Sequence, residues 1–446
     1  MHIRDTAPLF AWEALDDNPQ LDLIRRFLAV VPDGRLLASL RQWRGRGRDD
    51  YPVTVLWGTV LLTVLLRHPT FEATLAELER NPHLREVLGI RRASHVPKAW
   101  NVSRFLAVLG RPPNLTLLEE VFNQMIRLLG SVVGDLGQRT AGDSSALSAR
   151  AGGRANGDGL PEPTGGRKEY TDAQGQVVRV LKWFGYKLHL LVDVKHELAL
   201  ANRITSANVA DNEMLGALVA QGQANLPEGR MRTLAYDKAA DDVKVHQLLN
   251  REGIAPLIEN RALWKEELER MLPGHDGTSN VVHDESGTIY CYDKKSDPPV
   301  RHRMAYIGHE PSRGTLKYRC PAMHGRWKCP SRSVCNAGKK YGKTVRVKQA
   351  IDLRRFPPIP RATKQFERLY KGRTAVERVN GRLKIFWGAD DGNITGAARF
   401  HAFVGAVMVV HAGLGTLLAA APRQDGTLGR MRLGPIAKAL GEKLQI

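Results

Sequence analysis

The feature that most constrains this chain is a strong helix pattern over residues 363–386, which follows the proline-rich segment 357–360. Proline cannot sit in a helix interior, so these prolines fix where the helix begins. When each residue turns the helix by about 100°, four polar side chains share one arc about 60° wide: Tyr370, Arg373, Glu377 and Lys384. A solvated helix needs no such sorting of its side chains.

The apolar and basic residues of this helix fall on separate arcs: Leu369, Val376 and Leu383 on one, expected to face the core, and Lys371, Arg378 and Arg382 on a basic stripe. Glu377 therefore stands between cations at the edge of the buried face. This arrangement suits phosphoryl transfer, because a carboxylate binds a metal ion while neighbouring cations neutralise the phosphate under attack. From this helix alone, ordinary salt bridges on a surface helix are an equal alternative.

Two further carboxylates follow strand patterns earlier in the chain. Asp143 lies in a strand of small residues, 141–145, and Asp237 ends the apolar strand 234–237. A lone Asp at a strand end is usually a turn or helix-cap residue. Three carboxylates on two strands and a helix favour a metal-binding role over a turn or cap role, because two-metal phosphodiester chemistry needs several anionic oxygen ligands.

The middle of the chain alternates strand and helix patterns. Strands are expected at 138–147, 177–180, 185–193, 198–204, 232–237 and 254–258, and helices at 211–221 and 241–251. The glycine- and proline-rich stretch 151–168 is typical of a mobile loop. Antiparallel-type strands followed by alternating helix and strand predict an α/β fold, a mixed sheet covered by helices.

Four regions follow from these patterns. Residues 1–135 are expected to form a helical N-terminal domain, 136–261 the first part of the core, 262–360 an insertion, and 361–446 the helices that complete the core. The apolar run 53–66 is too short to span a bilayer, and the run 403–421 contains His411 and three glycines. A buried helix is the better interpretation of the second run, and no contact with a membrane is expected.

Charge points toward a polyanionic partner. The chain has 66 Lys and Arg against 46 Asp and Glu, a net charge of +20, which favours nucleic acid over membranes. The segment 41–48 combines four arginines with a tryptophan and two glycines, so it is either a flexible DNA-backbone contact or a solvated basic loop. Neither an export signal nor a disulfide framework is expected, which fits a reducing cytoplasm.

These motifs resemble those of bacterial insertion-sequence transposases, which use a DDE triad on a ribonuclease-H-like fold. Their third-acid helix has Tyr, two residues, Arg, three residues, Glu, six residues, Lys, as found here from Tyr370 to Lys384. Segment 235–242 is similar to the second-acid motif, although Tyr236 is inserted and Ala239-Ala240 replaces Gly-Tyr. Segments 143–145, 185–189 and 205–211 match the surrounding core, while 52–66 and 97–105 are similar to the N-terminal domain.

The resemblance implies roles for these residues. Asp143, Asp237 and Glu377 would coordinate two Mg²⁺ ions, for which Mn²⁺ can substitute, to cut and rejoin DNA. Arg373 and Lys384 would contact DNA near the scissile phosphate, and Tyr370 would help to position it. The DNA partners would be mobile-element ends and a target, bound by a homodimer at the bacterial nucleoid in the cytoplasm. The N-terminal domain and the basic stripe are the expected surfaces for reading bases.

The insertion raises two questions. The family commonly has a strand-rich insertion, and in some members its Trp supports a hairpin intermediate; here Trp264 and Trp327 are candidates, with simple packing as the favoured alternative. All four cysteines also lie there: Cys291, Cys320, Cys329 and Cys335, with His324 among them. A structural zinc ion is one interpretation, but the spacing lacks close cysteine pairs, so free thiols are the default.

Two other functions stay open at this point. One is a ribonuclease-H-like nuclease that hydrolyses DNA without strand transfer. The other is a catalytically silent DNA-binding repressor, against which the intact triad and its Tyr, Arg and Lys companions argue.

Overall fold

The computed structural model describes residues 19–420 and Leu428, with gaps at 47–48, 151–158, 173–175, 266–267, 274–279, 294 and 392–393. Its N-terminal third is helical: α1 (Pro19–Val30), α2 (Gly34–Arg44), α3 (Val53–Leu65), α4 (Phe71–Arg80), α5 (Pro82–Val87), η2 (Ala93–His95), α6 (Ala99–Leu109) and α7 (Asn114–Val132). The first four residues of the basic segment 41–48 close α2, whereas residues 47 and 48 lie outside the described residues.

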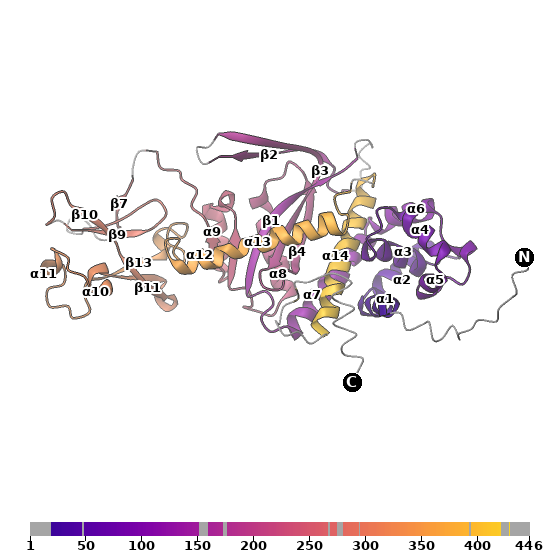
Figure 1. The fold of residues 1–446 in the computed structure, drawn as a ribbon, viewed down its shortest axis with the longest axis horizontal. Helices are drawn as coiled ribbons and strands as arrows, with labels where there is room; N and C mark the ends of the chain where they lie inside the picture. Colours follow the sequence, from indigo (N-terminus) through magenta and orange to yellow (C-terminus); the bar gives the residue numbers. More distant parts are fainter. Residues whose placement is uncertain are drawn as a thin grey trace, which may run out of the picture.

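A mixed sheet follows these helices and occupies the middle of the molecule (Figure 1). Its strands are β1 (Arg139–Ser148), β2 (Thr164–Thr171), β3 (Val177–Asp193), β4 (Ala199–Ser206), β5 (Thr233–Tyr236) and β6 (Ala255–Ile258). β3 runs antiparallel to β1, β2 and β4, while β1, β5 and β6 are parallel neighbours. Parallel strands need crossovers, and α8 (Asp211–Asn225) and α9 (Val243–Arg251) connect them. The predicted α/β class with a mixed sheet is confirmed.

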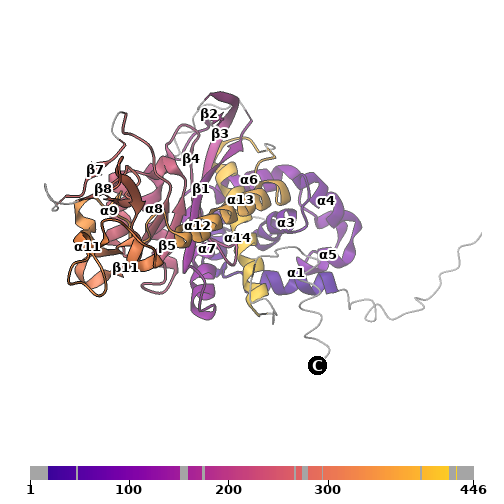
Figure 2. The same cartoon turned by 60° about the vertical axis from the view of Figure 1, so that its left-hand side comes forward.

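The β2–β3 ribbon, formed by β2 and the first half of β3, rises from the sheet in both views (Figures 1 and 2). The sequence prediction was wrong here: part of the expected loop is β2, and the two expected strands form one β3 of 17 residues. The glycine-rich sequence of β2 does not predict a strand; the strand forms because β2 makes backbone hydrogen bonds to β3. At Gly185, where the ribbon leaves the sheet, a Cβ would lie 2.1 Å from the Leu147 carbonyl oxygen.

The apolar C-terminal run forms α14 (Ala397–Ala420), which packs against α3, α6 and α7. Among the described helices it alone is long and apolar enough to cross a membrane, yet 78% of its most apolar window is buried inside the protein. Burial lowers the pKa of His411 to about 3, and its Nε2 accepts a hydrogen bond from the Ala199 backbone at 2.9 Å. A neutral histidine thus ties α14 to β4, and one apolar core runs from the N-terminal helices to α14.

The insertion has two small sheets and an apolar core of its own. The first sheet contains β7 (Arg270–Met271), β8 (Val281–His283), β9 (Ile289–Asp293) and β10 (Val300–Arg303). The second sheet contains β11 (Ala305–Glu310), β12 (Thr315–Arg319) and β13 (Thr344–Lys348). Two short helices, α10 (Pro321–Gly325) and α11 (Arg332–Cys335), lie between β12 and β13 in the sequence. It lies at the end of the molecule opposite the N-terminal helices (Figure 1). Both tryptophans contact side chains of this region: Arg270 lies over Trp264, and His302 lies beside Trp327.

The helix expected at 363–386 is present but not uniform. It consists of α12 (Lys364–Tyr370), a tight 3₁₀ turn η6 (Lys371–Arg373), α13 (Thr374–Gly381) and a wider π turn η7 (Arg382–Phe386). The Thr363 hydroxyl caps its first turn by accepting a hydrogen bond from the Phe366 backbone at 3.1 Å. Because the two irregular turns change the angle per residue, the assumption of a constant 100° was wrong across this segment.

Candidate active site

Asp143 and Asp237 reach matching positions on neighbouring parallel strands. Ala141 of β1 lies opposite Ala235 of β5, and each aspartate stands two residues further along its strand direction. Because side chains alternate between faces with a period of two, both carboxylates emerge from the same face. Gly142 makes room beside them, since a Cβ there would lie 2.5 Å from the ring of Tyr236.

Arg373 joins two of the three predicted carboxylates. Its Nη1 lies 3.6 Å from Asp143 Oδ2 and its Nη2 lies 3.0 Å from Glu377 Oε1. This contact arises because η6, which carries Arg373, packs against β1 and β5. The structure therefore brings Asp143, Arg373 and Glu377 together, with Asp237 on the adjacent strand.

Asp143 is largely buried. Its side chain is only 15% exposed. Burial raises its pKa, opposed by the Ser144 backbone N–H and the charge of Lys168, and the charge of Asp237 raises the pKa further. Lys168 comes from the β2–β3 ribbon, and sequence reasoning missed it because it placed this lysine in a loop. No local sequence signal could have identified it, since β2 and β1 are related only through β3, which pairs with both.

The other two residues predicted to contact DNA have partners within the chain. Tyr370 stacks on Phe366 with ring centroids 5.5 Å apart, and burial together with Glu259 raises its pKa to about 12. Lys384 donates to the Ala146 carbonyl at 2.6 Å and pairs with Asp390 at 2.9 Å.

The basic stripe is also partly engaged within the chain. Arg378 and Arg382 both pair with Glu197, at 2.6 and 2.7 Å. Lys371 pairs with Glu367 at 3.0 Å on the exposed side of the helix. The stripe is thus a set of ion pairs, two of which tie the helix to the turn between β3 and β4.

The carboxylates suit a divalent cation by chemical type. Mg²⁺ prefers oxygen ligands, and two of the three carboxylates, Asp143 and Glu377, share one guanidinium within ion-pair distance. Across the described ranges, however, no group of three or more His, Cys, Asp or Glu side chains is arranged to hold a metal ion. Arg373 contacts Asp143 and Glu377 instead, so metal binding requires this arginine to release them.

Comparison with known families assigns the chain. A family model described as the transposase DDE domain matches residues 156–412, which is more than half of the chain. The chain belongs to the DDE transposase family. The matched range of this transposase contains Asp237 and Glu377 and begins after Asp143. No curated protein matches the chain.

A second acidic cluster of the transposase lies four residues beyond Asp237. The buried Asp241 carboxylate pairs with Arg354 and Arg361, each at 2.8 Å, and lies 2.9 Å from His246 Nε2. It also accepts a hydrogen bond from the Arg261 backbone at 2.8 Å. Because both arginines follow the last strand of the insertion, this cluster fastens the insertion to the core.

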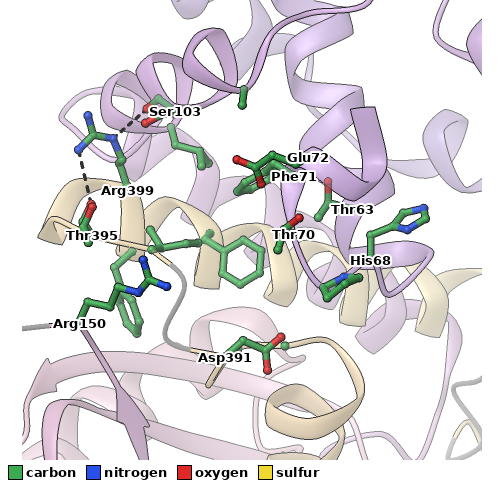
Figure 3. A pocket seen from close by; sticks show the side chains of 18 of the residues that line it. Thr63, His68, Thr70, Phe71, Glu72, Ser103, Arg150, Asp391, Thr395 and Arg399 are labelled. Carbon is green, nitrogen blue, oxygen red and sulfur yellow. Dashed lines mark hydrogen bonds between the residues drawn. The ribbon is translucent and has the colours of Figure 1, made fainter. Parts of the chain in front are cut away.

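A cavity of about 350 Å³ lies between the N-terminal helices and the start of α14 (Figure 3). Its walls carry Glu72, Arg150, Asp391 and Arg399, and Arg399 donates to the Ser103 carbonyl at 3.0 Å. None of the three predicted carboxylates lines it. The transposase therefore has its acidic site outside this cavity.

Proposed function

We propose that the chain is an insertion-sequence DNA transposase of bacteria, which binds the ends of a mobile element and catalyses metal-dependent cleavage and strand transfer by two-metal-ion chemistry. The observation that carries the proposal is the contact of one guanidinium, Arg373, with both Asp143 and Glu377, beside Asp237. Four strands joined by antiparallel pairs, β1 to β4, followed by the parallel strands β5 and β6, support a ribonuclease-H-like core. The protein acts at the nucleoid in the cytoplasm.

Asp143, Asp237 and Glu377 would hold the divalent ions, two Mg²⁺ or Mn²⁺. When bound, such ions supply activation of the attacking oxygen and stabilisation of the leaving oxygen. A guanidinium binds carboxylate and phosphate through the same N–H donors. Arg373 can therefore exchange its two carboxylates for a DNA phosphate. Before DNA binds, the guanidinium neutralises the carboxylates; after the exchange, the carboxylates are free to bind the metal ions.

The β2–β3 ribbon supports DNA binding at this site. Its exposed cations are Arg167, Lys168, Arg179 and Lys182. Lys168 lies near enough to Asp143 to influence its pKa, so the ribbon borders the acidic site. Exposed cations next to aromatic rings suit a nucleic-acid backbone, and Tyr170 lies within 5.9 Å of both Lys168 and Arg179. Lys384 and Tyr370 would then act near the scissile phosphate by exchanging their present partners.

The test uses labelled end DNA, target DNA and Mg²⁺, with the wild-type chain and Asp143→Asn. We expect strand-transfer products from wild type and none from the variant, with both proteins equally folded by circular dichroism. Glu228→Gln is the matched control, because it removes an exposed carboxylate outside the site. Hydrolysis without joined products would identify a nuclease instead, and binding without cleavage would identify a repressor.

Pairing of two ends implies a dimer on DNA. Sedimentation of the protein with end DNA should show two chains per complex. One chain per complex, in a preparation active for strand transfer, would contradict this part of the proposal.

A further inference from the structure

The four cysteines of the insertion lie around one cavity, although the first and the last are 44 positions apart in the sequence. Cys291 lies in β9, Cys320 directly precedes α10, Cys329 lies between the two short helices, and Cys335 ends α11. All four line a single cavity of about 20 Å³, and none forms a disulfide. A cavity of that size has room for about one water-sized sphere.

The cavity gathers the four cysteines from separate parts of the insertion. His324, which the sequence placed among the possible ligands, is exposed and does not line the cavity.

Hydrogen-bond donors surround the sulfurs from outside. Asn336 donates its side-chain amide to Cys320 Sγ at 3.7 Å, and Asn280 donates to Cys335 Sγ at 3.9 Å. Lys343 donates to the Asn280 side chain at 2.8 Å, which fixes that amide. Donors placed behind sulfur ligands orient them and stabilise their negative charge. Buried thiols that serve only as packing need no such donors.

We propose that Cys291, Cys320, Cys329 and Cys335 form a structural site for one Zn²⁺ ion. Four thiolates in a closed site are a usual ligand set for structural zinc. Across the described residues no group of three or more such side chains is arranged to hold a metal ion in this structure, so binding would require the sulfurs to move inward. Binding would also release the four thiol protons.

The ion would join the two sheets of the insertion. Cys291 belongs to the sheet that contains β9, and Cys320 follows β12 of the other sheet. The apolar core shared by these sheets is small, with nine buried residues. A small core gains much from a metal crosslink. The loose cysteine spacing argued against zinc at the level of the sequence. The fold removes that objection, because strand pairing brings cysteines that are distant in the sequence close together.

The test measures the metal content of the full-length protein by inductively coupled plasma mass spectrometry after gel filtration. We expect about one zinc per wild-type chain, and less than a tenth of that in a Cys291→Ser/Cys335→Ser variant. His324→Ala is the matched control and should keep its zinc. Cobalt substitution of the wild type should give the strong visible absorption of a tetrahedral tetrathiolate, which does not depend on a variant folding.

Three results would overturn the proposal: wild-type protein without zinc, zinc retained in the double cysteine variant, or iron in place of zinc. None of these outcomes depends on strand transfer, since the ligands lie outside the carboxylate site. A protein with zinc but without strand transfer would contradict only the proposed function.

Discussion

Two acidic clusters of this protein use the same side chains in opposite proportions. At the first, one arginine, Arg373, serves Asp143 and Glu377, with Asp237 close by. At the second, two arginines and a histidine surround the single carboxylate of Asp241. The first cluster has a surplus of negative charge, and the second has none. A cluster with more carboxylates than cations can bind a further cation. A cluster whose negative charge is fully balanced by arginines has a structural role.

The pKa values of the two aspartates move in opposite directions. Burial raises the pKa of Asp143, and the Ser144 backbone, Lys168 and Arg373 lower it too little to cancel that rise. Burial also acts to raise the pKa of Asp241, but His246, Arg361 and Arg354 outweigh it and hold that pKa below its ordinary value. Burial acts on both carboxylates, so the difference comes from their other neighbours. Asp143 has the like charge of Asp237 beside it, whereas Asp241 has hydrogen bonds from His246 and the Arg261 backbone in addition to its two arginines.

The largest expected effect is on catalysis at the first cluster. Glu377→Gln removes a charge from the carboxylate set and should lower the strand-transfer rate by about 10³-fold, the upper range for losing one electrostatic group of an active site. The midpoint of urea unfolding should stay the same, because the Glu377 side chain is 52% exposed. Glu367→Gln, on the exposed face of the same helix, is the control and should keep full activity. If Glu377→Gln kept its strand-transfer activity, the first cluster would not be catalytic, and the proposed difference between the two clusters would fail.

The second effect is on stability at the other cluster. Asp241→Asn leaves two buried arginines without their carboxylate, which should cost about 3–5 kcal/mol of the free energy of unfolding. The neighbouring Asp242→Asn removes only the carboxylate that caps α9 through the Lys244 backbone at 2.8 Å, and should cost about 1 kcal/mol or less. Urea denaturation measures both values. Equal costs for the two variants would show that the Asp241 cluster is not a fastening.

Sequence patterns identified most regular elements of the sheet, because periodicity is local. They missed β2, whose Gly165-Gly166 pair favours a loop and which forms a strand only through pairing with β3. They also missed the irregular turns at 371–373 and 382–386, since a helical wheel assumes a constant angle per residue.

In the candidate site, too, some residues could be identified from local sequence motifs, whereas others depend on tertiary contacts. Asp143, Asp237 and Glu377 could be named from their motifs, and the register of β1 and β5 together with Arg373 places them near one another. The contacts of Lys168 and Asp241 could not be predicted, because they join residues far apart in sequence. The motif at 235–242 combines one aspartate of each cluster, and only tertiary contacts separate their roles.

A third prediction concerns competition between Arg373 and metal. Without DNA, Arg373→Ala should bind Mg²⁺ about tenfold more tightly than wild type, because the carboxylates lose their internal cation. Mg²⁺ should consequently raise the melting temperature of this variant more than that of wild type. Arg373→Lys should behave like wild type. If Mg²⁺ stabilises all three proteins equally, Arg373 does not compete for the site.

A fourth prediction concerns the exposed cation of the first cluster. Lys168→Ala should reduce the salt dependence of DNA binding by about one in the slope of log Kd against log salt, the loss of one phosphate contact. Lys168→Arg should restore the slope because it keeps the charge. Fluorescence anisotropy with labelled end DNA over a range of salt gives the slope, and an unchanged slope for Lys168→Ala would falsify the phosphate contact.

The smallest effect is the pH dependence of the second cluster. Because the pKa of Asp241 is lowered in the folded protein, the folded state binds fewer protons than the unfolded state below the ordinary value of 3.8. The stabilisation is therefore complete above that value and is lost as the pH falls through the lowered pKa. His246, Arg354 and Arg361 are the charged or titratable groups that contact the carboxylate. Urea unfolding of wild type and Asp241→Asn should show a stability difference that shrinks on acidification below pH 3.8, and a constant difference would mean that the arginines do not act through the charge of Asp241.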